Sequence, residues 1–273
     1  MERKNIIGLC ICFAIFFLGF GAQGHLSLYF NLAGLLIVIG GTAGATLVSF
    51  RTKRLAILFK VLRTTYRSRV KDPEEMVEIL VDLSVKRKLR GLLSLEEDEE
   101  ETSVLFLRRG LGLLVDGYPR QEIRDVLSTE MHFFRIRREE SERVLRAIAE
   151  MCPSFGLVGS VVGLIGMLGG IGVDSSIVVN TIPVALTSTL YGVVFSNFFF
   201  LPFASSIKDR TDRELLLQKM IMEGIIAIGS ELNPRVLEMK LKSFLTPSSR
   251  KGRLVSLKRI QEKFKIQPEG SIS

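Results

Sequence analysis

The sequence predicts an all-α integral membrane protein with four transmembrane helices and a helical cytoplasmic domain between the second and third. This prediction rests on how charge is distributed along the 273 residues. Asn5–Phe50 contains no Asp, Glu, Lys or Arg, and Met151–Ile207 contains only Asp174. A charged side chain at the bilayer centre costs roughly 2.5–3.5 kcal/mol. Each charge-free block is therefore expected to lie in a membrane, and each is long enough for two spans.

A short connection divides each block into two spans. The expected spans are Ile6–Phe20, Leu28–Phe50, Ser154–Val173 and Ile177–Ala204, compared with the roughly 20 residues that a helix needs to cross the hydrocarbon. The chain starts like a secretory signal, but a second span follows almost at once, so an uncleaved helical hairpin is expected. Two prolines, Pro183 and Pro202, are expected to bend the last span.

The basic residues predict the orientation of the spans. Lys and Arg lie before the first span, after the second and after the fourth, whereas the connections Gly21–Ser27 and Gly172–Ser176 have none. This positive-inside pattern places both termini in the cytoplasm, so the net charge of +8 requires no nucleic-acid partner. The expected division is two spans in 1–50, a cytoplasmic domain in 51–150, two spans in 151–207, and a C-terminal helix with a basic tail in 208–273.

The cytoplasmic segments have helical signals. Asp72 followed by Pro73 is a typical helix start, and apolar residues then recur at helical spacing. A second helix is expected over Glu101–Val115, and a third starts at Pro119 and continues towards the third span. After the fourth span, Lys208–Leu232 is expected to be an amphipathic helix that ends at Asn233-Pro234, and the tail from Thr246 is expected to be mobile.

No residue pattern indicates an enzyme, a metal site or a cofactor. The glycines of Gly156–Gly163 imitate a phosphate-binding loop, but the run lacks the Gly-Lys-Ser/Thr ending and lies in an apolar span. His25 and His132 have no evident acid–base partner. Cys10 and Cys12 lie in the first span and Cys152 at the start of the third, which favours packing roles over a disulfide framework or a metal clip.

Glycines and hydroxyls recur inside the spans. Gly156, Gly159, Gly163 and Gly166 form a narrow face on which a second helix can pack closely. The hydroxyls of Ser160 and of several residues in the fourth span have two interpretations, which are hydrogen bonding between helices and the lining of an ion path. No carboxylate lies within the spans, because Asp174 is expected at the outer surface. If the chain conducts ions, the titrating acid must therefore come from a partner chain.

Two opposite charge blocks lie about ten residues apart in the cytoplasmic domain. Lys86-Arg87-Lys88-Leu89-Arg90 is followed by the acidic run Glu96–Glu101. Such runs are commonly solvated helix surfaces. They also suit a docking patch for a charged partner, since complementary fields favour fast and repeated encounters.

Several segments together resemble the MotA/PomA family of flagellar motor stator subunits. Asn31–Leu47 is similar to the second span of that family, and Arg90–Glu96 and Leu113–Gly117 are similar to its cytoplasmic signatures. Pro153–Gly163 resembles its third span, and Thr189–Asn197 with Pro202 resembles its fourth. The resemblance covers nearly the whole chain in the same order and stops near the basic tail.

This resemblance implies a function in converting ion flow into torque. It implies a homopentamer of this subunit in the bacterial inner membrane, around two copies of a MotB/PomB-type peptidoglycan-binding partner. That partner supplies a single span with an essential Asp. The transported ion is a proton or sodium, and the cytoplasmic charges act on the rotor protein FliG. No cofactor is implied.

The resemblance also implies roles for individual residues. Thr189 is expected to face the partner's Asp, and Ser160 falls where other members have Thr or Ala. The prolines expected to shape the conformational change are Pro153 and Pro202. The expected rotor-contact residues are Lys88, Arg90, Glu96, Glu97 and Glu99. Leu89 departs from the pattern, because some members have a second basic residue there.

Two other functions compete with this one. An ExbB/TolQ-type energiser of outer-membrane processes shares the plan of a pentamer around a dimer, but such chains typically have three spans and lack the two cytoplasmic signatures. A membrane scaffold without transport would account for the glycine faces alone.

Overall fold

The computed structural model describes residues 29–67, 71–171 and 175–247, together with isolated residues between 11 and 24. All regular structure in these residues is helical, so the all-α prediction is confirmed there. The helices are α2 (Leu32–Ser49), α3 (Thr52–Arg67), α4 (Pro73–Arg90), α5 (Glu96–Glu101), α6 (Leu105–Val115), α7 (Arg120–Gly170), α8 (Ser175–Val194), α9 (Leu201–Gly229) and α10 (Pro234–Lys242), with a 3₁₀ turn η2 (Leu92–Leu95) and a π-helix η3 (Phe195–Phe200).

The chain folds as two compact units. Unit 1 contains the described residues up to 67 and residues 137–210, and unit 2 contains residues 71–136 and 211–247. Both α7 and α9 begin in one unit and end in the other. The predicted first span, Cys10, Cys12, His25, Asp174 and the tail beyond Pro247 lie outside the continuously described residues.

Unit 1 holds the apolar segments predicted to cross the membrane. Within the described residues, three helices are long and apolar enough to do so, and they lie in Leu32–Ser49, Arg120–Gly170 and Val178–Gly229. Many large apolar side chains on these segments face outward, including Val48 (90% exposed) and Leu186 (69% exposed). The predicted third span is the last part of α7, which is one continuous helix of 51 residues with Pro153 inside it.

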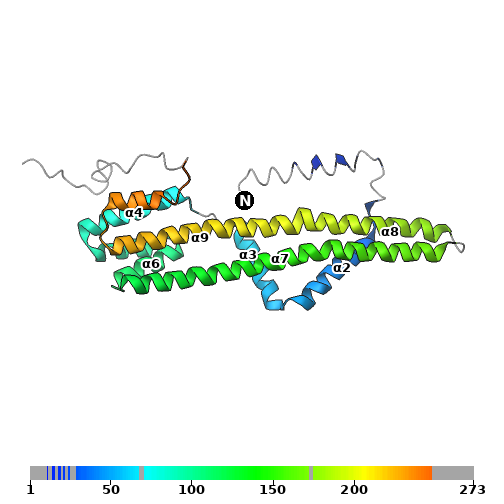
Figure 1. The fold of residues 1–273 in the computed structure, drawn as a ribbon, viewed down its shortest axis with the longest axis horizontal. Coiled ribbons are helices and arrows are strands. Elements are labelled where there is room, and N and C mark those ends of the chain that lie inside the picture. Colours follow the sequence, from blue (N-terminus) through cyan, green and yellow to red (C-terminus); the bar gives the residue numbers. More distant parts are fainter. Residues whose placement is uncertain are drawn as a thin grey trace, which may run out of the picture. The chain divides into compact units, whose positions relative to one another are not determined.

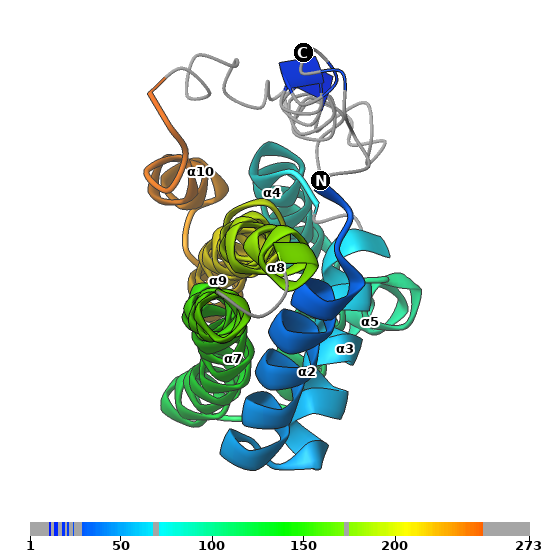
Figure 2. The ribbon, with the colours of Figure 1, turned by 90° about the vertical axis from the view of Figure 1, so that its right-hand side faces the viewer.

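In unit 1, α7 and α8 run side by side and α2 packs across them (Figures 1 and 2). Glycines make this contact close. A Cβ atom at Gly163 would lie 2.6 Å from the backbone nitrogen of Ala185, and one at Gly156 would lie 2.9 Å from the carbonyl oxygen of Ser188. The two backbones therefore touch where a side chain would otherwise separate them, which confirms the predicted glycine face.

A small apolar core joins α3 to α7 and α9 in unit 1. Its central residue on α3 is Leu58, which is 4% exposed, and Cys152 packs in the same cluster as a buried free thiol. This placement agrees with the packing role expected for Cys152. The buried members are Leu58, Val144, Leu145, Ile148, Cys152, Ala204 and Ile207.

A π-helical turn precedes Pro202. The backbone N–H of Leu201 donates to the carbonyl oxygen of Ser196, five residues earlier, at the end of the π-helix. A proline has no N–H, and its ring clashes with the carbonyl four residues before it; a wider turn next to that position relieves both problems. Pro183 also lies inside a helix, α8.

Unit 2 has a separate apolar core formed by α4, α6, α10, the start of α7 and the end of α9. Met76, Leu80 and Met220 are completely buried in it. The predicted start of α4 is confirmed, since the Asp72 side chain accepts from the N–H of Glu74 and Pro73 is the first helical residue. The helix predicted from Glu101 begins instead at Leu105, because the backbone is extended at Thr102 and Val104.

The close contact between α7 and α8 generates a prediction for stability. Gly163→Ala should destabilise the protein by about 1–3 kcal/mol, because the new methyl group would meet backbone atoms of α8 that cannot move cheaply. Thermal denaturation of the detergent-solubilised chain, followed by far-ultraviolet circular dichroism, measures this.

Gly169→Ala is the matched control on the same helix, since no atom of the described residues lies within 4 Å of its added Cβ. It should be neutral or slightly stabilising. Equal losses from both substitutions would show that the close contact does not determine stability.

Candidate functional site

The two predicted ion-pathway residues, Ser160 on α7 and Thr189 on α8, lie together in unit 1. Their hydroxyl groups are joined by a hydrogen bond, although 29 residues separate them in the sequence. The Ser160 hydroxyl oxygen also lies within hydrogen-bonding distance of two backbone carbonyl oxygens, that of Gly156 at 3.2 Å and that of Ala185 at 2.5 Å. Both side chains are half-buried. The pair therefore lies at the backbone contact that the glycines create.

Other hydroxyls of the fourth span have a different placement. Thr187 donates to the carbonyl oxygen of Pro183 at 2.6 Å, and Ser188 donates to that of Val184 at 2.6 Å. A Cβ atom at Gly34 of α2 would lie 2.7 Å from the Ser188 Oγ atom. These buried hydroxyls bond to their own helix at the contact with α2, so for them the interpretation as structural hydrogen bonding holds.

Tyr191 ties the start of α2 to α8. Its hydroxyl donates to the carbonyl oxygen of Tyr29 and accepts from the backbone N–H of Asn31 at 2.8 Å. Asn31 is in turn the cap of α2 and accepts from the N–H of Gly34 at 2.9 Å. Tyr191 lies in the Thr189–Asn197 segment that resembles the fourth span of the family, but no role was predicted for it. A signal was available, since a tyrosine in an apolar span needs a partner for its hydroxyl.

The basic run at the end of α4 divides into two pairs of residues in unit 2. Lys86 bonds Asp98 at 2.7 Å and Glu97 at 3.3 Å, and Arg87 donates to the carbonyl oxygen of Ile228. Burial lowers the pKa of Lys86, but its bonds to Asp98 and Glu97 outweigh that effect and raise the pKa above its usual 10.5. The predicted contact residues Lys88 and Arg90 are exposed.

The predicted acidic contact residues lie on α5, next to this basic run. Glu96 and Glu97 are exposed, and Glu97 reaches back to Lys86. Glu99 is half-buried, and its carboxylate lies so close to Gly112 of α6 that an added Cβ would be 2.8 Å from the Oε1 atom. The structure therefore presents four of the five predicted rotor-contact residues on the surface of unit 2 and turns Glu99 towards α6.

Comparisons with known proteins bear on what these features do. The profile of the MotA/TolQ/ExbB proton channel family matches residues 98–220. The chain is 30% identical to chemotaxis protein PomA of Vibrio alginolyticus, over 92% of this chain and 98% of that protein. It is 31% identical to motility protein A of Borreliella burgdorferi, over 92% and 96% respectively. The chain belongs to the MotA/PomA family.

Solved structures agree with this assignment. The structure of C. jejuni MotAB matches with a TM-score of 0.84 at 26% identity, covering 93% of this chain and 100% of that chain. The flagellar MotAB stator complex of Bacillus subtilis matches with the same score and identity, over 91% and 98%. The family resemblance and the assignment as a flagellar stator subunit are confirmed. PomA and motility protein A match over nearly their whole length, which favours this function over the energiser.

Unit 2 also contains an ionic cluster that the sequence analysis missed. Glu223 of α9 lies 2.6 Å from Lys240 of α10, 3.1 Å from Arg124 of α7 and 3.7 Å from Lys219. Burial raises the pKa of Glu223, but Lys240 and Arg124 outweigh it and hold the pKa below its usual 4.5. The cluster joins three helices. Only Lys219 has a local helical spacing from Glu223; no local motif could have revealed the other two cations, because Arg124 and Lys240 are 99 and 17 residues away on other helices.

Glu223 should make stability dependent on pH. Since its pKa is lowered in the folded state, its contribution is complete above pH 4.5 and is lost as the pH falls below that value. Glu223→Gln should lower stability by about 1–3 kcal/mol at neutral pH. It should also reduce the loss of stability that occurs as the pH falls below 4.5. Thermal denaturation of the detergent-solubilised chain across the range from neutral to acid pH measures both effects.

Glu231→Gln is the control for this test, because the Glu231 side chain is 81% exposed and its carboxylate forms an exposed ion pair with Arg87 at 3.4 Å. It should change stability little. If Glu223→Gln loses as much stability at acid pH as the unchanged chain does, Glu223 is not the group that makes stability depend on pH.

Proposed function

We propose that this chain forms the wall of an ion channel that is completed by a MotB/PomB-type partner, and that it transmits ion-driven movement to the rotor. The observation that carries the proposal is the hydroxyl pair of Ser160 and Thr189 in spans that have no acid of their own. Hydroxyl oxygens can ligate sodium or relay a proton, but a charge-carrying step in a membrane generally uses an ionisable group. The partner's span would supply that group beside Thr189.

The proposed membrane arrangement follows the four predicted spans. Residues 1–50 and 151–207 lie in the bacterial inner membrane, and residues 51–150 and 208–273 lie in the cytoplasm with both termini. The apolar side chains exposed along α2, α7 and α8 support this placement, because they suit lipid or neighbouring subunits. The glycine contacts and these exposed faces also suit the proposed homopentamer around two partner chains.

Pro153 and Pro202 are proposed to set where the long helices bend. Pro153 lies at the backbone contact with Gly192 of α8, whose added Cβ would be 3.0 Å from the Cα atom of Pro153. Pro202 follows the π-helical turn, and π-helical turns are frequent at functional sites. Because α7 and α9 each have residues in both units, a bend at either proline would be transmitted along the helix into unit 2, which has the charged surface.

The charged surface of unit 2 is proposed to contact FliG. Lys88, Arg90, Glu96 and Glu97 are exposed, and Glu99 supports α5 against α6. Lys86 and Arg87 are occupied within the unit, so they would position the contact residues and not bind the rotor themselves. Exposed charges of both signs suit a contact that forms and breaks repeatedly.

The ion pathway is tested by Thr189→Ala in the chain co-expressed with its partner in a flagellated strain that is non-motile because its own stator is deleted. Swimming should fall by at least tenfold in speed or in the fraction of motile cells, because one of the two hydroxyls is lost, while the pair still assembles. Tethered-cell rotation and co-purification of the partner measure torque and assembly separately. Ser154→Ala is the matched control, since among the described residues its hydroxyl bonds only the Glu150 carbonyl of its own helix, at 3.0 Å.

Reversal of Glu96 and Glu97 to Lys separates the two halves of the proposal. Ion flux should persist while rotation is lost, because the pathway residues are unchanged. If Thr189→Ala rotates normally across all loads, Thr189 is not part of the ion pathway. If the Glu96 and Glu97 reversal abolishes ion flux, these residues do not act through rotor contact alone and the proposed rotor surface is wrong.

A further inference from the structure

Helix α3 is strongly basic along its whole length. Residues 51–67 contain no Asp or Glu, and α3 follows α2, a candidate membrane span, after only Phe50 and Arg51. Five cations on this segment are exposed, and they are Arg51, Lys53, Arg54, Lys60 and Arg63. A run of this kind directly beside a span is attracted to an anionic membrane surface by about 1 kcal/mol per cation.

The same helix also exposes apolar side chains. Phe59 is 70% exposed and Ile57 is 47% exposed, whereas Leu58 between them is buried in the core of unit 1. Cations mixed with exposed aromatic and aliphatic side chains are typical of a helix that lies in the boundary between headgroups and acyl chains. Charge alone would explain attraction to any anion, but the apolar side chains favour a lipid.

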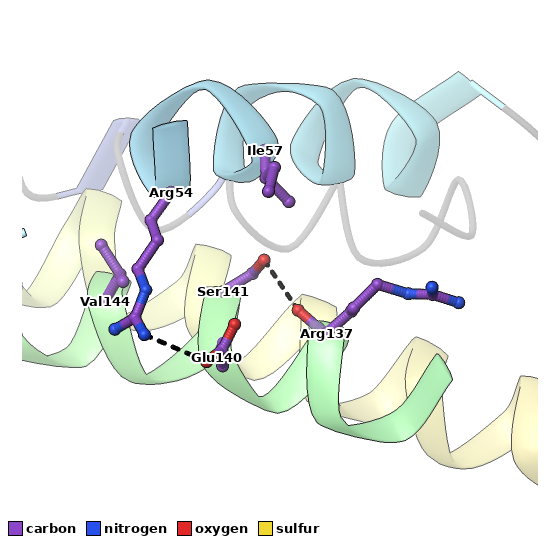
Figure 3. A pocket seen from close by; sticks show the side chains of 6 residues that line it. All are labelled: Arg54, Ile57, Arg137, Glu140, Ser141 and Val144. Carbon is purple, nitrogen blue, oxygen red and sulfur yellow. Dashed lines mark hydrogen bonds and ion pairs between the residues drawn. The ribbon is translucent and has the colours of Figure 1, made fainter. Parts of the chain in front are cut away.

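A small pocket lies between α3 and α7 at this surface (Figure 3). It is lined by two arginines, a carboxylate, a hydroxyl and two apolar side chains, from Arg54, Arg137, Glu140, Ser141, Ile57 and Val144. Figure 3 shows Arg54 reaching from α3 towards Glu140 on α7, with Ile57 above Ser141. The pocket therefore combines apolar walls with donors suited to a phosphate group.

The donors of this pocket are available to a ligand. Arg54 and Glu140 are 3.6 Å apart, and their side chains are 54% and 45% exposed, so their ion pair is weak. The Arg137 side chain is exposed, and within the described residues its guanidinium group has no hydrogen bond or ion pair. Its backbone carbonyl accepts from the Ser141 hydroxyl at 3.1 Å. An anion could therefore compete with Glu140 for Arg54 and draw in Arg137.

We propose that this pocket binds the phosphate of an anionic phospholipid headgroup, with its acyl chains along Ile57 and Phe59 of α3. Arg54 and Arg137 donate to the phosphate oxygens, and the remaining cations of α3 hold the anionic surface around it. The proposal depends on the membrane placement of α2 and not on torque generation. The site would anchor α3 to the membrane boundary at the place where the chain leaves its second span.

Lipid retention by the full-length chain tests the proposal. The chain, purified in detergent, is titrated with dioleoyl phosphatidylglycerol, with dioleoyl phosphatidylcholine or with inorganic phosphate, and native mass spectrometry records the bound lipid. Phosphatidylglycerol should be retained and phosphatidylcholine should not. Arg54→Gln with Arg137→Gln should weaken retention about 30-fold, at roughly fivefold for each cation.

Arg120→Gln with Arg235→Gln is the matched control, because it removes two exposed cations of unit 2 and leaves the pocket intact. It should retain phosphatidylglycerol within about twofold of the unchanged chain, with both double variants in the same oligomeric state. Equal retention by the pocket variant would overturn the proposal. So would displacement of the lipid by an equal concentration of inorganic phosphate, or a changed oligomeric state, which would assign the surface to a second copy of the chain.

Discussion

The structure of unit 1 depends on the close approach of the α7 and α8 backbones. Gly156 and Gly163 permit it, since a side chain at either position would meet backbone atoms of α8. The hydroxyls of Ser160 and Thr189 meet because this approach brings them within bonding distance. In lipid, apolar side chains gain little by leaving one apolar environment for another, so helices associate through packing and polar contacts. The same glycine contact thus provides both stability and the candidate pathway.

The chemistry of the predicted spans is the basis for the proposal that a second chain supplies the titrating group. The spans offer hydroxyls and backbone carbonyls, and the only carboxylate in their blocks of sequence is Asp174, which is expected at the outer surface. Hydroxyls can line a path, but they do not titrate near neutral pH. In unit 2, by contrast, charged residues are abundant, and some of them form ion pairs between helices, as Lys86 and Glu223 do. The chain therefore separates a nearly uncharged wall from a charged surface.

Much of this arrangement could be predicted from the sequence, because it depends on local patterns. The charge-free blocks, the Asp72-Pro73 helix start and the glycine spacing each indicate one element or one face without knowledge of its neighbours. The Ser160 and Thr189 candidates followed from the resemblance to the MotA/PomA family and not from local patterns, which left structural hydrogen bonding as an alternative. Helix α10 was missed, because Asn233-Pro234 was interpreted only as a stop. The same signal is a start, with Asn233 as the cap and Pro234 as the first helical residue.

Other features required the three-dimensional structure. The Glu223 cluster joins residues from three helices, and the bond from Tyr191 to the start of α2 connects residues about 160 apart. The division of the basic run into bound Lys86 and Arg87 and exposed Lys88 and Arg90 depends on packing against α5 and α9. Charge runs in a sequence do not reveal which members have internal partners.

In the proposed stator, this chain is a channel wall without its own titrating group. Ion flux into vesicles reconstituted with the chain alone and with the chain and its MotB/PomB-type partner tests it most directly, with pH-sensitive and sodium-sensitive dyes inside. The chain alone should give no flux above the lipid background, and the pair should give a flux that disappears when the partner's span Asp is replaced by Asn. Flux through the chain alone, or through the pair with that Asp replaced, would contradict it.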